Sequence, residues 1–353
     1  MVFILAEGVN HKGKLDLAYK LIDIAVEAKA DAIKFQSFNQ EYLIYSNVSN
    51  SQYKLENANK DETQFNMIKK LELSYDDLKK IFKRCIEKGI MFVSSPFDIE
   101  SVDFLENIGV SIFKVGSSEL TNYLLLKRIA QTGKKIILST GMSTLEEVKK
   151  SVNFIKKQGN SNIVLLHCVS SYPTQKEDLN LKCINTLKTE LNLDVGFSDH
   201  TTDFNTSIYS IAAGSTYIEK HFTINKDMYC SNHSSSLIPE ELTEFVKQLR
   251  DFEIIMGDGI KICKKNEENT RKDTRKSLQY NKNLKKGHIL KQDDIIALRP
   301  YNGICVSKYE SLLGKKLIND TKKKSLIKWT DFDSSKKINY NNNKGFSYYT
   351  YPC

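Results

Sequence analysis

The chain has 353 residues, of which 40% are hydrophobic, and this is enough for a large folded core. No apolar run approaches the roughly 20 residues that a membrane span needs, so we expect no membrane partner. The first residues are too few and too uncharged for a signal peptide, and the seven cysteines are scattered, which fits reduced thiols and a cytoplasmic location.

The net charge of +9 is unevenly distributed along the chain. Residues 261–353 contain 22 Lys and Arg against 9 Asp and Glu, whereas residues 1–260 contain 30 against 34. A basic segment of this kind can bind nucleic acid, form a solvated face or attract an anionic substrate. No nucleic-acid-binding motif accompanies the charge, so we expect no nucleic-acid partner.

In chain order, the first 260 residues alternate between strand and helix patterns. Apolar residues recur at helical spacing in the segments between the strands, as in 15–25 and 78–85. The strands are continuous apolar runs, which is typical of parallel strands covered on both faces. The expected strands are 2–7, 31–36, 90–95, 111–116, 135–140, 162–168, 194–198 and 215–221.

Eight such repeats predict an α/β fold, a (β/α)8 TIM barrel over residues 1–260. The alternative, a doubly wound open sheet, should carry a G-x-G-x-x-G turn after the first strand, and the sequence has none. Segment 37–73 is too long for an ordinary connection and is either a lid or a disordered loop.

The C-terminal part has a different character. Residues 261–277 are polar and predict a linker, and 278–332 contain short strand-like pieces with glycine turns, which predict a small, mostly-β module. Residues 333–353 show no periodicity and predict a flexible tail.

Polar residues follow nearly every expected strand, where barrel enzymes place their chemistry. His200 and His221 end the last two strands and could share one metal ion with open positions for a substrate, although each could also be a hydrogen-bonded core residue. Lys34 and Lys114, with the hydroxyls of Ser117 and Ser139, predict an anion site.

Other polar residues at the strand ends have less specific readings. Glu7 and Glu119 could be general bases or could neutralise the lysines. We expect His11 and His167 to orient neighbours rather than to bind metal. Helix caps are the alternative for three hydroxyl residues, Ser94, Ser118 and Thr140.

The motifs at these positions resemble those of the sialic acid synthase family, which makes nonulosonic acids such as N-acetylneuraminate, legionaminate and pseudaminate. The resemblance covers residues 3 to about 332, and the C-terminal module resembles the family's antifreeze-like SAF domain. The motifs are LAEGVNHKG, AIKFQSF, FVSSPFD, FKVGSSELTNYLLL, IILSTGM, LLHCVSSYPT, GFSDHT, YIEKHFT and LRPYNGI.

The resemblance implies a transferase that condenses phosphoenolpyruvate with an N-acylated mannosamine-type sugar and releases phosphate. His200 and His221 would hold a divalent ion, for which Mn²⁺ is expected and Mg²⁺ and Co²⁺ are the alternatives. The family's first-strand glutamate corresponds to Glu7. The resemblance also implies a homodimer in which the SAF domain of one subunit covers the barrel of the other. The substrate-binding residues that it implies are Lys34, Gln36, Ser95, Lys114, Ser117, Ser139, Ser170, Tyr172, Asn232 and Arg299, together with Glu119 beside the sugar.

Three departures from the family pattern matter. The first motif is one residue short, and a slip of one residue could turn Glu7 away from the site. The usual G-P-D-H is replaced by Cys230-Ser231-Asn232-His233, and Gln175 stands where the family has proline. These changes leave a second reading open, in which the chain binds metal, phosphoenolpyruvate or sugar without efficient turnover. An unrelated metal-dependent aldolase would not explain the SAF-like module.

Overall fold

The computed structural model describes residues 2–43, 69–226 and 236–333. The chain divides between Asp258 and Gly259 into two compact units, and each is described by itself. Asn232, most of the long segment 37–73 and the C-terminal tail lie outside the described residues.

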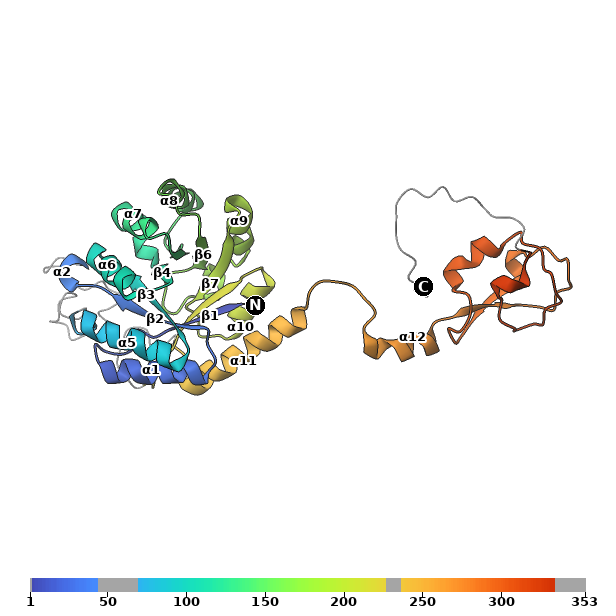
Figure 1. Cartoon of the computed structure of the whole chain (residues 1–353), viewed down its shortest axis with the longest axis horizontal. Coiled ribbons are helices and arrows are strands. Elements are labelled where there is room, and N and C mark those ends of the chain that lie inside the picture. The colour runs from blue at the N-terminus through green and yellow to red at the C-terminus, as the bar shows by residue number, and fades with distance from the viewer. Residues whose placement is uncertain (1, 44–68, 227–235, 334–353) are drawn as a thin grey trace. The chain divides into compact units, whose positions relative to one another are not determined.

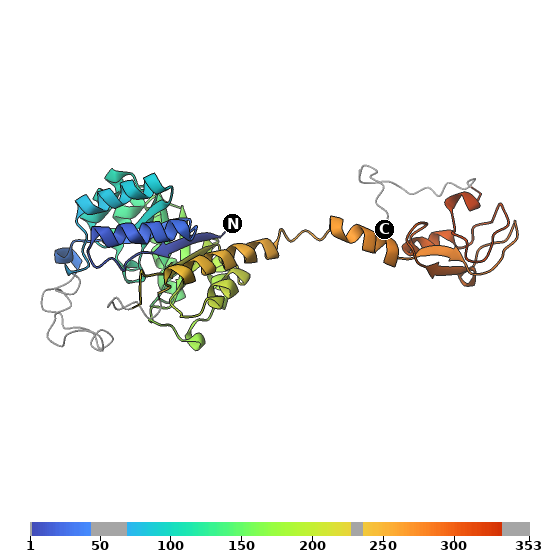
Figure 2. The ribbon, with the colours of Figure 1, turned by 90° about the horizontal axis from the view of Figure 1, so that it is seen from below.

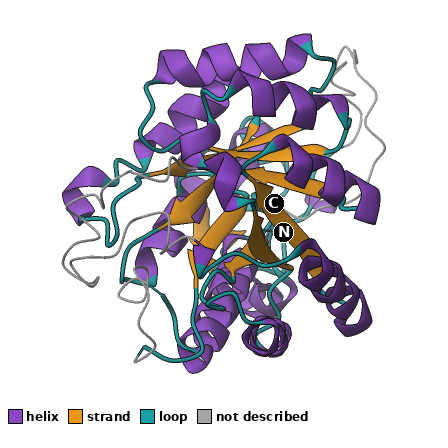
Figure 3. Cartoon of the chain, turned by 90° about the vertical axis from the view of Figure 1, so that its left-hand side faces the viewer, coloured by secondary structure: helices purple, strands orange, loops and turns teal. Residues whose placement is uncertain are grey.

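The first unit is a closed barrel of eight parallel strands, each hydrogen-bonded to the next, with β8 closing onto β1. The helices surround this ring of strands (Figures 1 and 3). The predicted (β/α)8 barrel is therefore confirmed. The strands are β1 (Phe3–Glu7), β2 (Ala32–Ser37), β3 (Met91–Pro96), β4 (Ile112–Val115), β5 (Lys135–Ser139), β6 (Ile163–Cys168), β7 (Asp194–Asp199) and β8 (Tyr217–His221).

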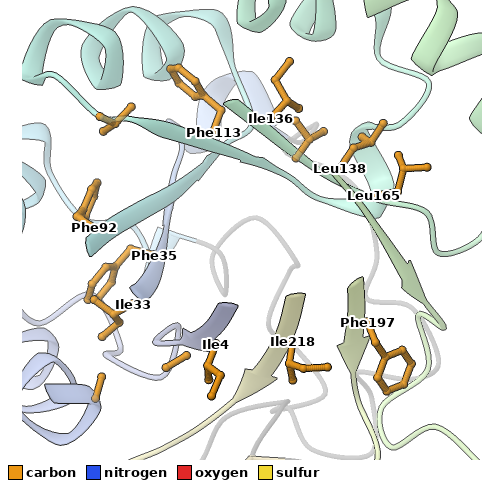
Figure 4. Close-up of a cluster of buried hydrophobic side chains, with 14 of the residues drawn as sticks. Ile4, Ile33, Phe35, Phe92, Phe113, Ile136, Leu138, Leu165, Phe197 and Ile218 are labelled. Atoms are coloured by element: carbon orange, nitrogen blue, oxygen red, sulfur yellow. The ribbon is translucent and has the colours of Figure 1, made fainter. Parts of the chain in front are cut away.

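Side chains along each strand alternate between two apolar layers, because successive residues of a strand point to opposite faces. One set points outward against the helices (Figure 4), as Ile4, Phe113 and Ile218 do. The other set fills the barrel interior below the site. This interior cluster is Leu5, Ala32, Val93, Ile112, Ile137, Val164 and Leu166.

The helices around the barrel begin at side-chain caps that the sequence supplies. Ser74 and Asp98 accept hydrogen bonds from backbone N–H groups of the first turns of α5 and α6, at 3.1 and 2.6 Å. The first and last long helices, α1 and α11, lie side by side (Figures 1 and 2). The α-helices of this unit are α1 (Leu15–Glu27), α2 (Gln40–Leu43), α5 (Tyr75–Lys88), α6 (Ile99–Ile108), α7 (Tyr123–Gln131), α8 (Leu145–Lys157), α9 (Lys182–Leu191), α10 (Asn205–Ala212) and α11 (Pro239–Met256).

The second unit has its own small core. Helix α12 (Glu268–Thr274) lies within the segment that we expected to be a linker, and β9 (Ser277–Tyr280) pairs antiparallel with β10 (Ile295–Leu298). The buried core residues of this unit are Leu278, Tyr280, Leu284, Leu290, Ile304, Leu312, Leu317, Ile327 and Phe332. The prediction of a small, mostly-β module is confirmed.

Two further expectations can be compared with the fold. Within the described parts of the chain, no helix is both long and apolar enough to cross a membrane. Cys85, Cys168, Cys183 and Cys263 are free thiols. Cys305 is disulfide-bonded, so the expectation that every cysteine is reduced is wrong at this position.

Candidate active site

The polar side chains gather at the C-terminal end of the barrel, which we call the mouth. Glu7, Lys34, Lys114 and Glu219 continue the inward-facing positions of β1, β2, β4 and β8 above the interior apolar cluster, and all four are buried. Buried charged groups are stable only when they pair with an opposite charge in the protein or in a bound ligand. The contacts below show how the pairing is arranged.

Glu7, His200 and His221 form the upper part of the site. One ligand atom from each residue lies within 4.8 Å of the others, and all three residues are buried. His221 Nε2 lies 2.9 Å from Glu7 Oε2, whereas His221 Nδ1 is buried without a hydrogen-bond partner among the described residues. Two imidazoles and a carboxylate are ligands that a divalent transition metal accepts, so these residues fit a metal ion.

Backbone contacts fix the chemical form of His200. Its Nδ1 lies 2.8 Å from the carbonyl oxygen of Val169, which can only accept, so Nδ1 carries the proton. The lone pair therefore sits on Nε2, as a metal ligand requires. The ring of Tyr172 covers His200 with their centroids 4.1 Å apart, and its centroid lies 5.8 Å from that of His221.

Two lysines form the lower part of the site. Lys34 forms ion pairs with Glu7 and with Glu219, the second at 3.2 Å between Nζ and Oε2. Burial alone would lower the pKa of Lys34, but Glu219 and Glu7 raise it above its usual value. Burial alone would likewise raise the pKa of Glu7, but His221 and Lys34 hold it well below its usual value, so this carboxylate is ionised at neutral pH.

Lys114 has a less favourable environment. Its Nζ donates to Ser139 Oγ at 2.7 Å and to the carbonyl oxygen of Val115 at 3.2 Å, and it lies 3.6 Å from Glu219 Oε1. Burial lowers the pKa of Lys114, and Glu219 offsets only part of this effect. An additional anion beside Lys114 would stabilise its charged form.

A third group of atoms surrounds Gly141, directly after β5. The Gly141 N–H donates to Ser117 Oγ at 3.0 Å, and a Cβ at this position would lie 2.8 Å from the same oxygen and still closer to Ser170 Oγ. A side chain at this position would therefore displace both hydroxyls. The hydroxyls and the nearby ammonium of Lys114 are donors suited to a phosphate group.

Two parts of the chain match models of known protein families. Residues 21–261 match the NeuB family, and residues 275–333 match the SAF domain. The chain belongs to the NeuB family. Its named relatives are synthases, so the prediction of a transferase that forms carbon–carbon bonds is confirmed.

Three relatives show how far the likeness to other NeuB proteins extends. The chain is 43% identical over 328 residues to N,N'-diacetyllegionaminic acid synthase of Campylobacter jejuni, covering 92% of this chain and 98% of the relative. It is 38% identical to the Legionella pneumophila enzyme of the same name, covering 94% and 95% of the two chains. It is 34% identical to the pseudaminic acid synthase of Campylobacter jejuni, covering 94% and 96%.

Solved structures agree with the NeuB fold. The chain matches the N-acetylneuraminic acid synthetase of Leptospira borgpetersenii with a TM-score of 0.68 and 34% identity, covering 76% of this chain and 90% of that one. A second match, the spore coat polysaccharide biosynthesis protein E of Chromobacterium violaceum, has a TM-score of 0.81, covers 94% and 100% of the two chains, and is 23% identical, so it supports the fold alone.

Most of the predicted site residues of this NeuB chain meet at the mouth. Glu7 faces His221 and Lys34, so the shortened first motif does not turn it away. Gln36 and Ser95 pair in register at the ends of β2 and β3. The other predicted residues with contacts at the mouth are Lys34, Lys114, Ser117, Ser139, Ser170, Tyr172, His200 and His221.

Other predicted residues lie elsewhere or bind locally. Glu119 follows β4 and accepts a hydrogen bond from Asn122 at 2.7 Å. Arg299 is exposed in the second unit, and Asn232 lies outside the described residues. His11 and His167 bond backbone groups near their own strands: His11 Nδ1 accepts from Gly13 N at 3.1 Å, and His167 Nε2 donates to the Leu179 carbonyl at 2.7 Å.

Sequence reasoning gave no role to three residues at the mouth, namely Glu219, Ser198 and Cys168, although Ser198 and Glu219 stand among the polar residues at the predicted strand ends. Ser198 donates to Glu219 at 2.8 Å, and Cys168 Sγ lies 3.9 Å from His200 Nδ1. Glu219 stands two residues before His221 and Ser198 two before His200, so the two-residue period of a strand was the pattern that could have found both.

Proposed function

We propose that this NeuB protein is a nonulosonic acid synthase that condenses phosphoenolpyruvate with an N-acylated mannosamine-type sugar. The observation that carries the proposal is the meeting of two groups of residues at one barrel mouth. In the first group, Lys34 and Lys114 are buried and share Glu219, and Lys114 also donates to Ser139 Oγ. The second group is Glu7, which pairs with Lys34, together with His200 and His221. The first group suits an anionic substrate, and the second suits a carbonyl that must be polarised.

The metal in this proposal is Mn²⁺, with Mg²⁺ and Co²⁺ as alternatives. His200 and His221 would hold it, and Glu7 offers a third ligand. When bound, the ion would act as a Lewis acid on the aldehyde oxygen of the open-chain sugar.

Other residues at the mouth would bind phosphoenolpyruvate and orient it for the reaction. Lys34, Lys114, Ser117 and Ser139, with Ser95 and Ser170, would bind phosphoenolpyruvate and orient its carbon 3 toward the aldehyde carbon. A carbon–carbon bond forms there, water adds at carbon 2, and the phosphate leaves with its bridging oxygen. Glu7 is ionised at neutral pH, so its carboxylate can accept a hydrogen bond from this water.

Sugar recognition involves residues from more than one part of the chain. Gln36 and Tyr172 would contact the sugar at the mouth, and Glu119, in the segment after β4, and Asn232 would join them. We propose that Arg299 reaches the N-acyl group from the SAF domain of a second copy in a swapped homodimer. The basic character of residues 261–353 and the acidic balance of residues 1–260 favour such docking.

A panel of sugars tests the proposal. The chain should release phosphate from phosphoenolpyruvate only when Mn²⁺ and an acceptor sugar are present. Because two relatives are named N,N'-diacetyllegionaminic acid synthases, the sugar precursor of that acid is the first acceptor to test. N-Acetylmannosamine and the precursor of pseudaminate complete the panel. Release of phosphate at the same rate without sugar, or with none of the three, would contradict the proposal.

A further inference from the structure

Glu219 occupies an unusual place for a carboxylate. It lies on the inward face of β8, next to Leu5 and Ser198 in the strand register, and is only 3% exposed. The interior apolar cluster lies below it. Burying an ionised group beside such an apolar cluster costs free energy unless its partners compensate for the lost water.

The partners of Glu219 are the two lysines of the proposed anion site. Lys34 Nζ lies 3.2 Å from Oε2, and Lys114 Nζ lies 3.6 Å from Oε1. Within residues 2–43, 69–226 and 236–333, no other carboxylate forms an ion pair with Lys114. Glu7 pairs with Lys34 but not with Lys114, so Glu219 is the acid that both ammonium groups share.

Glu219 also connects the lysines to the metal-binding part of the site. Ser198 Oγ donates to Glu219 Oε1 at 2.8 Å and lies 3.4 Å from His200 Nε2. The carboxylate therefore has contacts in three directions: to β2, to β4, and through β7 to His200.

We propose that Glu219 is a positioning residue that fixes the two ammonium groups of Lys34 and Lys114 where an anionic substrate meets them. Two like charges repel each other, and their shared carboxylate offsets part of this repulsion before the substrate arrives. The assignment of that substrate as phosphoenolpyruvate rests on the proposed function, whereas the binding of an anion does not.

This role has a consequence that a merely structural role lacks. The negative charge of Glu219 stands beside the place that the anion takes, so it improves the geometry of the lysines while weakening the attraction for the anion. Neutralising Glu219 should therefore separate affinity from turnover: anions should bind more tightly, and the reaction should become slower.

The test compares Glu219→Gln, which keeps the shape of the side chain, with Ser198→Ala, which keeps the charge of Glu219 and removes the Ser198 hydroxyl that contacts Glu219 and His200. Calorimetric titration with inorganic phosphate and with phosphoenolpyruvate measures affinity, and phosphate release with the acceptor sugar measures kcat. We expect Glu219→Gln to bind both anions at least ~3-fold more tightly and to lose at least ~30-fold in kcat. Ser198→Ala should leave the affinity for inorganic phosphate within about twofold of the unaltered chain, since it changes no charge.

Weaker or unchanged anion binding by a folded Glu219→Gln chain would overturn the inference, as would an unchanged kcat. If Glu219→Gln does not fold, Glu219→Asp supplies the test: its charge is kept and its reach is shorter, so kcat should fall without tighter binding. A chain that binds both anions but never turns over would refute the proposed function, and the affinities would still decide the role of Glu219. A chain that binds neither anion would overturn both.

Discussion

At the scale of single residues, the site depends on contacts that set protonation and orientation before any substrate binds. The bond between His200 Nδ1 and the Val169 carbonyl leaves Nε2 free to coordinate. The contact between His221 Nε2 and Glu7 joins the second imidazole to a carboxylate that stays ionised. Each histidine is thus oriented by a contact of one ring nitrogen, His200 with a backbone carbonyl and His221 with a carboxylate.

The first prediction concerns these two ligands. His200→Ala or His221→Ala should lower the rate at least ~100-fold, because either change removes a ligand of a Lewis acid that stabilises developing charge. Each should also weaken Mn²⁺ binding measured by calorimetry. His167→Ala is the matched control, because His167 bonds the Leu179 carbonyl and is not one of the grouped ligands. Full activity of the unaltered chain in excess chelator would contradict the metal assignment.

Polar residue types at or near the strand ends led to the prediction of Lys34, Lys114, His200 and His221, and the family motifs added the other predicted site residues. Glu219 was given no role. Glu219 is one of three consecutive polar residues that end β8, and whether it points to the mouth or to the helices depends on the register of that strand in the barrel. The same dependence made the orientation of Glu7 uncertain until its contacts were known.

At the scale of elements, glycine and short polar turns let the strands and loops approach one another. At Gly196 of β7, a Cβ would lie 2.5 Å from Tyr217 Cβ and 2.7 Å from Leu166 Cδ2, so only glycine allows β7 to pack between β6 and β8. The sequence pattern predicted where the strands begin and end, to within two residues, because parallel strands are apolar on both faces. It could not predict α12, because a polar segment of seven residues has no apolar face to indicate a helix.

The second prediction concerns the turn before β10. Asp294 is buried and accepts hydrogen bonds from Lys291 N at 2.8 Å and His288 Nε2 at 2.7 Å, and Lys282 lies 2.9 Å away. Burial alone would raise its pKa, but these partners lower it from 3.8 to about 2. A carboxylate whose pKa is lowered by folding stabilises the fold above its unfolded pKa and loses this contribution as the pH falls through its folded pKa.

The second unit should therefore be stable at neutral pH and lose stability progressively between about pH 5 and pH 2. Asp294→Asn should unfold more easily at pH 7 and show a flatter dependence over that range. Hydrogen exchange of β9 and β10 in the full chain measures this, and Asp320→Asn, at an exposed ion pair with Lys285, is the control. Equal acid sensitivity of the unaltered and Asp294→Asn chains would contradict the prediction.

At the scale of the whole molecule, the two units carry opposite charge. Residues 1–260 have a slight acidic excess, and residues 261–353 carry the basic excess of the chain. The predicted role of Arg299 requires the second unit of one copy to reach the mouth of another.

The third prediction tests this sharing. Chains carrying Arg299→Ala and chains carrying His221→Ala should each be slow. Mixing them should restore part of the activity, because a mixed dimer would contain one mouth in which both Arg299 and His221 are intact. Losing one guanidinium hydrogen bond should cost roughly 1.5–3 kcal/mol in sugar recognition, measured as a higher sugar KM. The absence of any recovery on mixing would favour a site built within one chain.

In the proposed reaction, the barrel mouth joins phosphoenolpyruvate to a sugar with cleavage of the carbon–oxygen bond of the phosphate ester. The most direct measurement uses phosphoenolpyruvate labelled with ¹⁸O at the bridging position, the acceptor sugar and Mn²⁺, with mass spectrometry of both products. We expect the released phosphate to retain the label and a nonulosonic acid, the sugar extended by three carbons, to form in equal amount. Unlabelled phosphate, or labelled phosphate without a condensed product, would contradict the proposed reaction.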